Sequence, residues 1–242
     1  MRQIRKIGIL GAMASEMEAI KASIEQPRTE EISGVSFVQG TIHGIEVVAA
    51  TCGIGKVFAA ICAQTMILTY HPALVINVGV AGSLNPKLNI GDSAVADKVV
   101  QHDMDAAAIG FEVGYLAGID KVYLPCSEEV VRMMDACADA LGFRHETGVV
   151  ATGDVFMTDS QKKKQVADAF GAICCEMEGG SIGQVCYVND TEFCILRAIS
   201  DNGDENAHDD YHMSLDMAAD RATQVMDRFL SNLAVGQKVF QG

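Results

Sequence analysis

Basic residues are scarce in this chain. Its 242 residues include 18 Lys and Arg against 32 Asp and Glu, which gives a formal net charge of −14. Proteins that bind nucleic acids or anionic membrane surfaces need fields of Lys and Arg, because the phosphates that they contact are anionic. We therefore expect no nucleic-acid partner and no membrane partner.

Cysteine pairs with metal-type or redox-type spacing are also missing. The chain has eight Cys, but no two of them form C-x-x-C. At the N-terminus, the charged residues Arg2, Arg5 and Lys6 are followed by an apolar run of only a few residues, which is too short for a signal peptide. These features predict a cytoplasmic protein with free thiols.

One long segment, residues 57–86, contains no Asp, Glu, Lys or Arg. It is long enough to cross a bilayer, but Pro72 divides it, and proline removes an amide donor and clashes with the preceding turn. The pattern instead predicts a helix over 57–70 and a buried strand over 74–78. We expect no transmembrane helix.

Strand-like and helical patterns alternate along the chain, and no linker, repeat or low-complexity tract interrupts them. The predicted strands are 6–10, 35–42, 45–51, 74–78, 93–100, 148–152, 173–177 and 193–199. The predicted helices are a stretch from about residue 15, then 57–70, 128–141, 160–170, 180–188 and 214–233. The alternation predicts one α/β domain over residues 1–234, whose mostly parallel sheet is covered on both faces. A hairpin at His43-Gly44 makes the sheet mixed, and residues 235–242 are predicted to be a frayed tail.

Ligands of such sheets bind beyond the carboxyl ends of the strands. The segments that follow the predicted strands carry glycine-rich turns, three carboxylates and an aromatic ring. These side chains are Glu16, Glu178, Asp201 and Phe156. The sequence therefore predicts a small-molecule site at this edge.

Two phosphate-binding motifs are absent from these glycine turns. The glycines never form G-x-G-x-x-G, and Gly55-Lys56 lacks the other residues of a P-loop. The pair His208 and His212, and also His102, stand beside carboxylates, but no third ligand has the right spacing for a metal. We predict neither a cofactor nor a metal.

The acids near the first turn have two interpretations. Ser15-x-x-Glu18 has the form of a helix capping box, and acids in a first turn favour the helix dipole. Glu16 also faces the predicted ligand edge, which favours a functional role.

The carboxylates later in the chain also have more than one interpretation. Glu176 and Glu178 flank Met177, and two carboxylates in a buried segment need partners, for which Arg197 is available. Asp201 follows Ser200 at a strand end, where an aspartate often caps a turn. The residues alone predict a carboxylate-rich cleft for a neutral or cationic organic substrate.

Taken together, the motifs are more specific than any one of them. They occur in the order Lys6-Ile-Gly-Ile-Leu-Gly-Ala-Met with Glu16, Cys52-Gly-Ile-Gly-Lys-Val, Asn77-Val-Gly-Val-Ala-Gly, His102-Asp-Met-Asp, Thr152-Gly-Asp-Val-Phe, Glu176-Met-Glu and Arg197-Ala-Ile-Ser-Asp201. From about residue 6 to 233 the chain closely resembles the bacterial 5′-methylthioadenosine/S-adenosylhomocysteine nucleosidases of the nucleoside phosphorylase-like superfamily. The resemblance implies a three-layer α/β/α fold around a mixed sheet, a homodimer, and hydrolysis of the N-glycosidic bond with release of adenine.

The resemblance also implies roles for individual residues. Asp201 would protonate adenine N7, Glu16 would activate the attacking water, and Glu178 would bind the ribose hydroxyls. The remaining substrate-binding residues implied are Ser200 and Arg197 near the acids, Met177 at the sugar, Phe156 and Met157 at adenine, Met13, Ile54, Val80 and Tyr211 on the wall of the cleft, and Ala106 and Ile109 reaching over from the other subunit.

Two related activities remain as alternatives: a futalosine-type nucleoside hydrolase and a phosphate-dependent phosphorylase. Phosphorylases of this superfamily use an Arg near the first glycine turn, where this chain has Glu16 and no arginine. That difference favours water as the nucleophile. The departures from the family at Val80, Ile109 and Tyr211 leave open which 5′ substituent is preferred.

Overall fold

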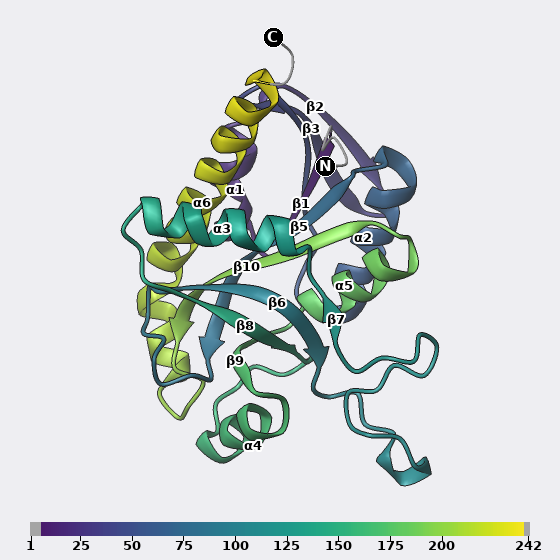
Figure 1. The fold of residues 1–242 in the computed structure, drawn as a ribbon, viewed down its shortest axis with the longest axis vertical. Coiled ribbons are helices and arrows are strands. Elements are labelled where there is room, and N and C mark those ends of the chain that lie inside the picture. Colours follow the sequence, from purple (N-terminus) through teal and green to yellow (C-terminus); the bar gives the residue numbers. More distant parts are fainter. Residues whose placement is uncertain (1–5, 240–242) are drawn as a thin grey trace.

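The computed structural model describes residues 6–239, whose elements follow one another as strand and helix (Figure 1). The helices are α1 Ala14–Ala22, α2 Lys56–Tyr70, α3 Glu128–Ala140, α4 Ser160–Phe170, α5 Gly179–Val188 and α6 Ala207–Val239, with a 3₁₀ turn at Ala107–Ile109. The strands are β1 Lys6–Gly11, β2 Glu25–Ile32, β3 Val35–Ile42, β4 Ile45–Thr51, β5 Leu74–Ser83, β6 Ser93–Gln101, β7 Leu124–Pro125, β8 His145–Thr152, β9 Ala172–Glu176 and β10 Glu192–Asp201.

The strands form one mixed sheet in the order β10-β6-β8-β9-β5-β1-β4-β3-β2, with β7 paired to β6. β10 also pairs with β5, so five strands at this end of the sheet close on themselves. Most paired residues belong to parallel neighbours, such as β1 with β4 and β5 with β10. The predicted mixed sheet is confirmed.

Helices cover the sheet on both sides. α2 packs against α5 on one side, whereas α1 and α3 pack against α6 on the other (Figure 1). All ten residues of β5 are buried, as a strand between two helical layers requires. The three-layer α/β/α architecture is therefore confirmed, and it brings the carboxyl ends of β1, β5 and β10 to one edge, because these strands are parallel.

The hairpin between β3 and β4 has the predicted turn. Ile42 pairs with Ile45, and both His43 and Gly44 have positive φ angles, 53° and 82°. Two such residues in a two-residue loop match the right-handed twist of the strands.

The two largest differences from the sequence prediction are at β2 and α6; the short strand β7 and the 3₁₀ turn were not predicted either. β2 is missing from the prediction because its residues, EQPRTEEI, are polar and almost all exposed; the strand lies at the sheet edge and pairs only with β3. α6 begins at Ala207 instead of residue 214. The Ala207 amide donates to the Asp204 carbonyl at 2.9 Å, and the first-turn acids Asp209 and Asp210 suit the helix dipole, so the acidic segment starts a helix.

At its other end, α6 continues to Val239, five residues beyond the predicted end of the domain, and residues 240–242 lie outside the described part of the chain. Within residues 6–239, no helix combines the length and the apolar character that a bilayer-spanning segment needs. All eight cysteines are buried and free, as predicted.

Candidate active site

A cavity of about 410 Å³ lies where the predicted ligand edge was expected. Its walls come from the ends of β1, β5, β9 and β10, and from the start of α6. The residues that line it are Ala12, Met13, Glu16, Ile54, Val80, Gly82, Val155, Phe156, Met157, Cys175, Glu176, Met177, Glu178, Ser200, Asp201, His208, Tyr211 and His212.

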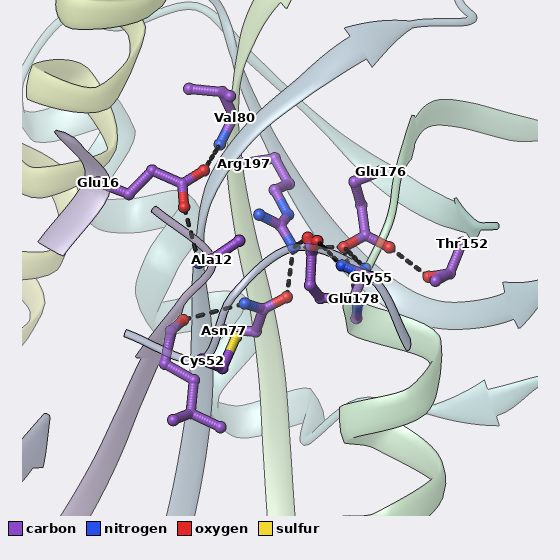
Figure 2. Close-up of polar contacts among 12 residues, drawn as sticks. Ala12, Glu16, Cys52, Gly55, Asn77, Val80, Thr152, Glu176, Glu178 and Arg197 are labelled. Carbon is purple, nitrogen blue, oxygen red and sulfur yellow. Dashed lines mark hydrogen bonds and ion pairs between the residues drawn. The ribbon is translucent and has the colours of Figure 1, made fainter. Parts of the chain in front are cut away.

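Glu16 is held in this cavity by main-chain donors, and the residue is 3% exposed. The amides of Ala12 and Met13 donate to Oε2 at 2.8 and 2.9 Å, and the Val80 amide donates to Oε1 at 3.0 Å (Figure 2). A carboxylate accepts about four hydrogen bonds. Three are used here, so one acceptor position remains, on Oε1.

Helix α1 begins one residue after Met13, which makes Glu16 the third residue of the helix. Its bond to the Met13 amide is one half of a capping box, so the capping residue is Glu16 and not Glu18, which is exposed. The structural and functional interpretations of the sequence therefore apply to the same side chain.

A second group of charges lies beneath the cavity floor, around Arg197, which is 1% exposed. Its Nη2 donates to Glu176 Oε2 and to Asn77 Oδ1, and it lies 3.6 Å from Glu178 Oε2 (Figure 2). Glu176 also accepts from the hydroxyl of Thr152 and from the Gly179 amide. The buried cation is thus matched mainly by Glu176, which confirms the pairing expected for one of these two glutamates.

The negative charge of Glu178 is less well compensated by hydrogen-bond donors and by Arg197 than that of Glu176. Glu178 accepts from the Gly55 amide at 2.9 Å and is 4% exposed. Burial raises the pKa of Glu178 to about 7, although the Arg197 cation acts in the opposite direction and the charge of Glu176 adds to the rise. This carboxyl group therefore exchanges protons near neutral pH.

A glycine is required at residue 79, between Arg197 and Glu16. A Cβ atom built on Gly79 would lie 2.3 Å from Arg197 Nη1 and 2.4 Å from Glu16 Oε1. No side chain fits there, because both neighbours are buried and held by hydrogen bonds. Gly79 thus brings Arg197 and the remaining acceptor of Glu16 close together.

Asp201 ends β10 on the same cavity, and its residue is 2% exposed. The Ser200 hydroxyl donates to Oδ2 at 2.8 Å and the Gly203 amide donates to Oδ1 at 2.9 Å. Burial raises the pKa of Asp201 above its ordinary value, while these two hydrogen bonds oppose the rise and the charges of Asp210 and Asp204 add to it. The shift favours the protonated acid.

Apolar side chains form the upper wall. The Phe156 ring meets the Tyr211 ring edge to face, with centroids 5.6 Å apart, and the Tyr211 hydroxyl contacts Met13 Sδ at 3.1 Å. Phe156 is half-exposed, which leaves a ring face available for a flat ligand.

The structure brings eleven of the fourteen predicted site residues to the cavity wall. Of the other three, Arg197 lies behind the floor and reaches the cavity through Glu176 and Glu178. Ala106 and Ile109 do not line the cavity of this chain; Ile109 is 77% exposed at the tip of a loop.

Several lining residues were not among the predicted site residues. Glu176 was noted only as a partner for a cation, and His208 and His212 only as metal candidates. The others, Ala12, Gly82, Val155 and Cys175, are neighbours of predicted residues, and their small or apolar side chains carry no chemical signal in a sequence.

Comparison with known proteins gives a consistent result. A model of the phosphorylase superfamily matches residues 6–231. The 5′-methylthioadenosine/S-adenosylhomocysteine nucleosidase of Shewanella pealeana is 36% identical over 207 residues, which are 85% of this chain and 90% of that protein.

Solved structures agree in fold. The nucleosidase of that name from Neisseria meningitidis, in complex with methylthio-immucillin-A, has a TM-score of 0.91 and 27% identity, and the match covers 94% of this chain and 99% of that one. Futalosine hydrolase of Helicobacter pylori has a TM-score of 0.90 and 31% identity, with 96% and 100% covered. The chain therefore belongs to the phosphorylase superfamily and, within it, to the family of the 5′-methylthioadenosine/S-adenosylhomocysteine nucleosidases.

Proposed function

We propose that this protein is an enzyme that hydrolyses the N-glycosidic bond of 5′-methylthioadenosine and S-adenosylhomocysteine, releasing adenine and the 5-thio-ribose. The observation that carries the proposal is the pairing, in one cavity, of a carboxyl group whose pKa is raised with a carboxylate fixed by three amides. Family membership supplies the substrate class.

Asp201 acts as the general acid in this proposal. Departure of adenine places negative charge on the base, and a proton delivered to N7 neutralises it. Burial raises the pKa of Asp201, which keeps more of the side chain in the acid form, and each of its oxygens receives one donor, so a lone pair remains for the proton. Ser200 fixes the orientation of the carboxyl group.

Glu16 acts on the water. Its three amide donors hold the carboxylate rigid and leave one acceptor on Oε1, which would bind the attacking water and take its proton. Because the donors come from both β1 and β5 segments, the water position is fixed relative to the sheet.

Glu178 binds the ribose hydroxyls, with Met177 against the sugar. The positive charge that develops on the ribose is stabilised by the nearby carboxylates, as in glycosidases. Phe156 stacks on adenine and the Met157 main chain reads its edge. Met13, Ile54 and Tyr211 form the wall around the 5′ substituent, and Val80 contributes its amide to Glu16.

A second candidate is hydrolysis of futalosine or a related 6-oxo nucleoside. The observation that favours it is the fold match to futalosine hydrolase of Helicobacter pylori, at 31% identity. The two reactions share the sugar chemistry and differ in the purine released.

The proposal includes a homodimer in the cytoplasm. α2 presents an exposed apolar face, with Val57, Phe58, Ile61 and Leu68 all at least 45% exposed, and such a patch commonly pairs with a partner. Ala106 and Ile109 lie in an exposed loop and would complete the site of the second subunit.

The test is a substrate panel with product analysis. Purified protein is incubated with 5′-methylthioadenosine, S-adenosylhomocysteine and futalosine, with and without phosphate. We expect adenine from the first two at rates independent of phosphate. Hypoxanthine from futalosine, with no adenine from the other two substrates, would support the second candidate. A sugar 1-phosphate, such as 5-methylthioribose 1-phosphate from 5′-methylthioadenosine, would identify a phosphorylase.

A further inference from the structure

The mouth of the cavity differs in chemistry from its floor. Buried carboxylates, Glu16, Glu178 and Asp201, form the floor, whereas two exposed histidines, His208 and His212, line the mouth. The reaction proposed above uses neither histidine.

The two rings form a compact pair. They lie one turn apart at the start of α6, with ring centroids 4.5 Å from each other. The Tyr211 ring lies 5.6 Å from that of His212, and its hydroxyl contacts Met13. The pair therefore continues the wall assigned to the 5′ substituent toward solvent.

Charge makes this pair distinctive. Four acids line the cavity, Glu16, Glu176, Glu178 and Asp201, and the chain carries a net charge of −14. Among the described residues that line the cavity, His208 and His212 are the only side chains able to carry positive charge. Of the ionisable groups that line the cavity, the four acids repel an anionic group on a ligand, and this pair can attract one.

The orientation of the His208 ring is set by one neighbouring acid. The Nδ1 atom of His208 lies 3.0 Å from Asp209 Oδ1, which fixes the ring and directs Nε2 away from that carboxylate. Because Nδ1 donates to Asp209, Nε2 can donate to a ligand carboxylate in the imidazolium form, which carries a proton on both nitrogens. The acids beside the pair attract ammonium groups. A histidine pair flanked by Asp209 and Asp210 suits an α-amino acid, which carries both charges.

We propose that His208 and His212 form a subsite for the α-carboxylate of the homocysteinyl tail, and that they set the preference for S-adenosylhomocysteine over 5′-methylthioadenosine. This proposal rests on the proposed function. It assigns the pair to substrate specificity and not to bond cleavage.

The test compares substrates that differ only in the tail. kcat/KM is measured for S-adenosylhomocysteine, 5′-methylthioadenosine, 5′-butylthioadenosine and 5′-(3-aminopropylthio)adenosine, in the native protein and in the double variant His208→Ala, His212→Ala. The matched control is Met213→Ala, because Met213 is 84% exposed on the same helical turn and does not line the cavity.

We expect the ratio of kcat/KM for S-adenosylhomocysteine to that for 5′-methylthioadenosine to fall about tenfold or more in the double variant, as loss of hydrogen bonds to a charged group implies. The corresponding ratios for the butyl and aminopropyl tails, which lack the carboxylate, should change less than about twofold, the scatter of a rate ratio with no carboxylate to lose. Met213→Ala should leave all ratios as in the native protein.

An unchanged ratio, or an equal fall for all four substrates, would overturn the proposal. A fall for the aminopropyl tail as large as that for S-adenosylhomocysteine would also overturn it, since the carboxylate would then be irrelevant. If the native protein releases adenine from none of the four, the proposed function itself fails and the subsite falls with it.

Discussion

Replacing Glu16 with glutamine changes both an acceptor and a charge in a buried position. In the native protein, Ala12 and Met13 donate to one carboxylate oxygen and Val80 donates to the other. Glutamine has one oxygen and one NH2 group in place of the two oxygens. In either orientation, its NH2 group therefore faces at least one backbone N–H.

The orientation of the glutamine side chain with the lower free energy keeps the hydrogen bonds from the Ala12 and Met13 amides. It leaves the Val80 amide opposite the NH2 group. A buried donor without an acceptor costs about 1–3 kcal/mol, and the two bonds that remain lose roughly 1 kcal/mol together when their acceptor becomes neutral. We expect Glu16→Gln to lower the free energy of unfolding by about 3 kcal/mol. An acid that acted only on the helix dipole would account for about 0.3–1 kcal/mol.

Urea unfolding followed by circular dichroism measures the stability, and single-turnover release of adenine measures the chemistry. Glu18→Gln is the matched control, because Glu18 is exposed on the same helix. The variant at residue 16 should lose both stability and hydrolysis, and the control should lose neither. A change in stability below about 0.5 kcal/mol, together with unchanged adenine release, would refute both the buried geometry and the role in water activation.

Three further outcomes are expected. Asp201→Asn should slow single-turnover adenine release by about 10²–10⁴-fold, the usual contribution of a general acid, while calorimetric binding of a nucleoside analogue persists; near-native turnover would remove the acid from Asp201. Burial raises the pKa of Glu178 to about 7 from an ordinary value of 4.5, so its contribution to stability is full below pH 4.5 and is lost as pH rises through 7. The native protein should thus lose up to about 3 kcal/mol relative to Glu178→Gln between pH 4.5 and 8 in urea titrations, and parallel curves would contradict this shift. Phe58→Asp should weaken self-association in sedimentation, because Phe58 is 62% exposed on α2; an unchanged mass at every dilution would place the interface elsewhere.

Much of the fold could be predicted from the sequence, because the core strands are recognisable as apolar runs. β5 is apolar apart from Asn77 and Ser83, and its burial on both faces is what such a strand predicts. The position of the site could be predicted because the ends of parallel strands meet at one edge of the sheet. Glu178 lies two residues after β9, and Asp201 is the last residue of β10.

Two peripheral features, strand β2 and the start of α6, were not predicted from the sequence. β2 is polar and exposed, and its pairing with β3 depends on backbone bonds that leave no hydrophobic pattern. The segment 202–212 gives a polar pattern with no core-facing period, so the start of α6 at Ala207 was missed. Once the helix starts there, His208 and His212 fall on the face that meets the cavity.

The buried charge network around Arg197 could be predicted only in part. Arg197 in an apolar strand predicted a buried ion pair, but the choice of Glu176 over Glu178 as its main partner depends on side-chain geometry that no spacing encodes. Burial raises the pKa of Glu178, and the Arg197 cation offsets only part of this rise. Ala106 and Ile109 do not line the cavity of their own chain, and their contribution to a second subunit remains a prediction.

The most direct test of the account is isotope transfer from water. 5′-Methylthioadenosine is incubated with the protein in water enriched in oxygen-18, without phosphate, and both products are analysed by mass spectrometry. If Glu16 activates water and Asp201 protonates adenine, the native protein releases adenine and a sugar with one oxygen-18 atom at C1, and Glu16→Gln and Asp201→Asn do so at least about 10²-fold more slowly. The sugar is reduced with borohydride as it forms, because its C1 oxygen otherwise exchanges with water. No reaction until phosphate is added, or a sugar product without the label, would contradict the account.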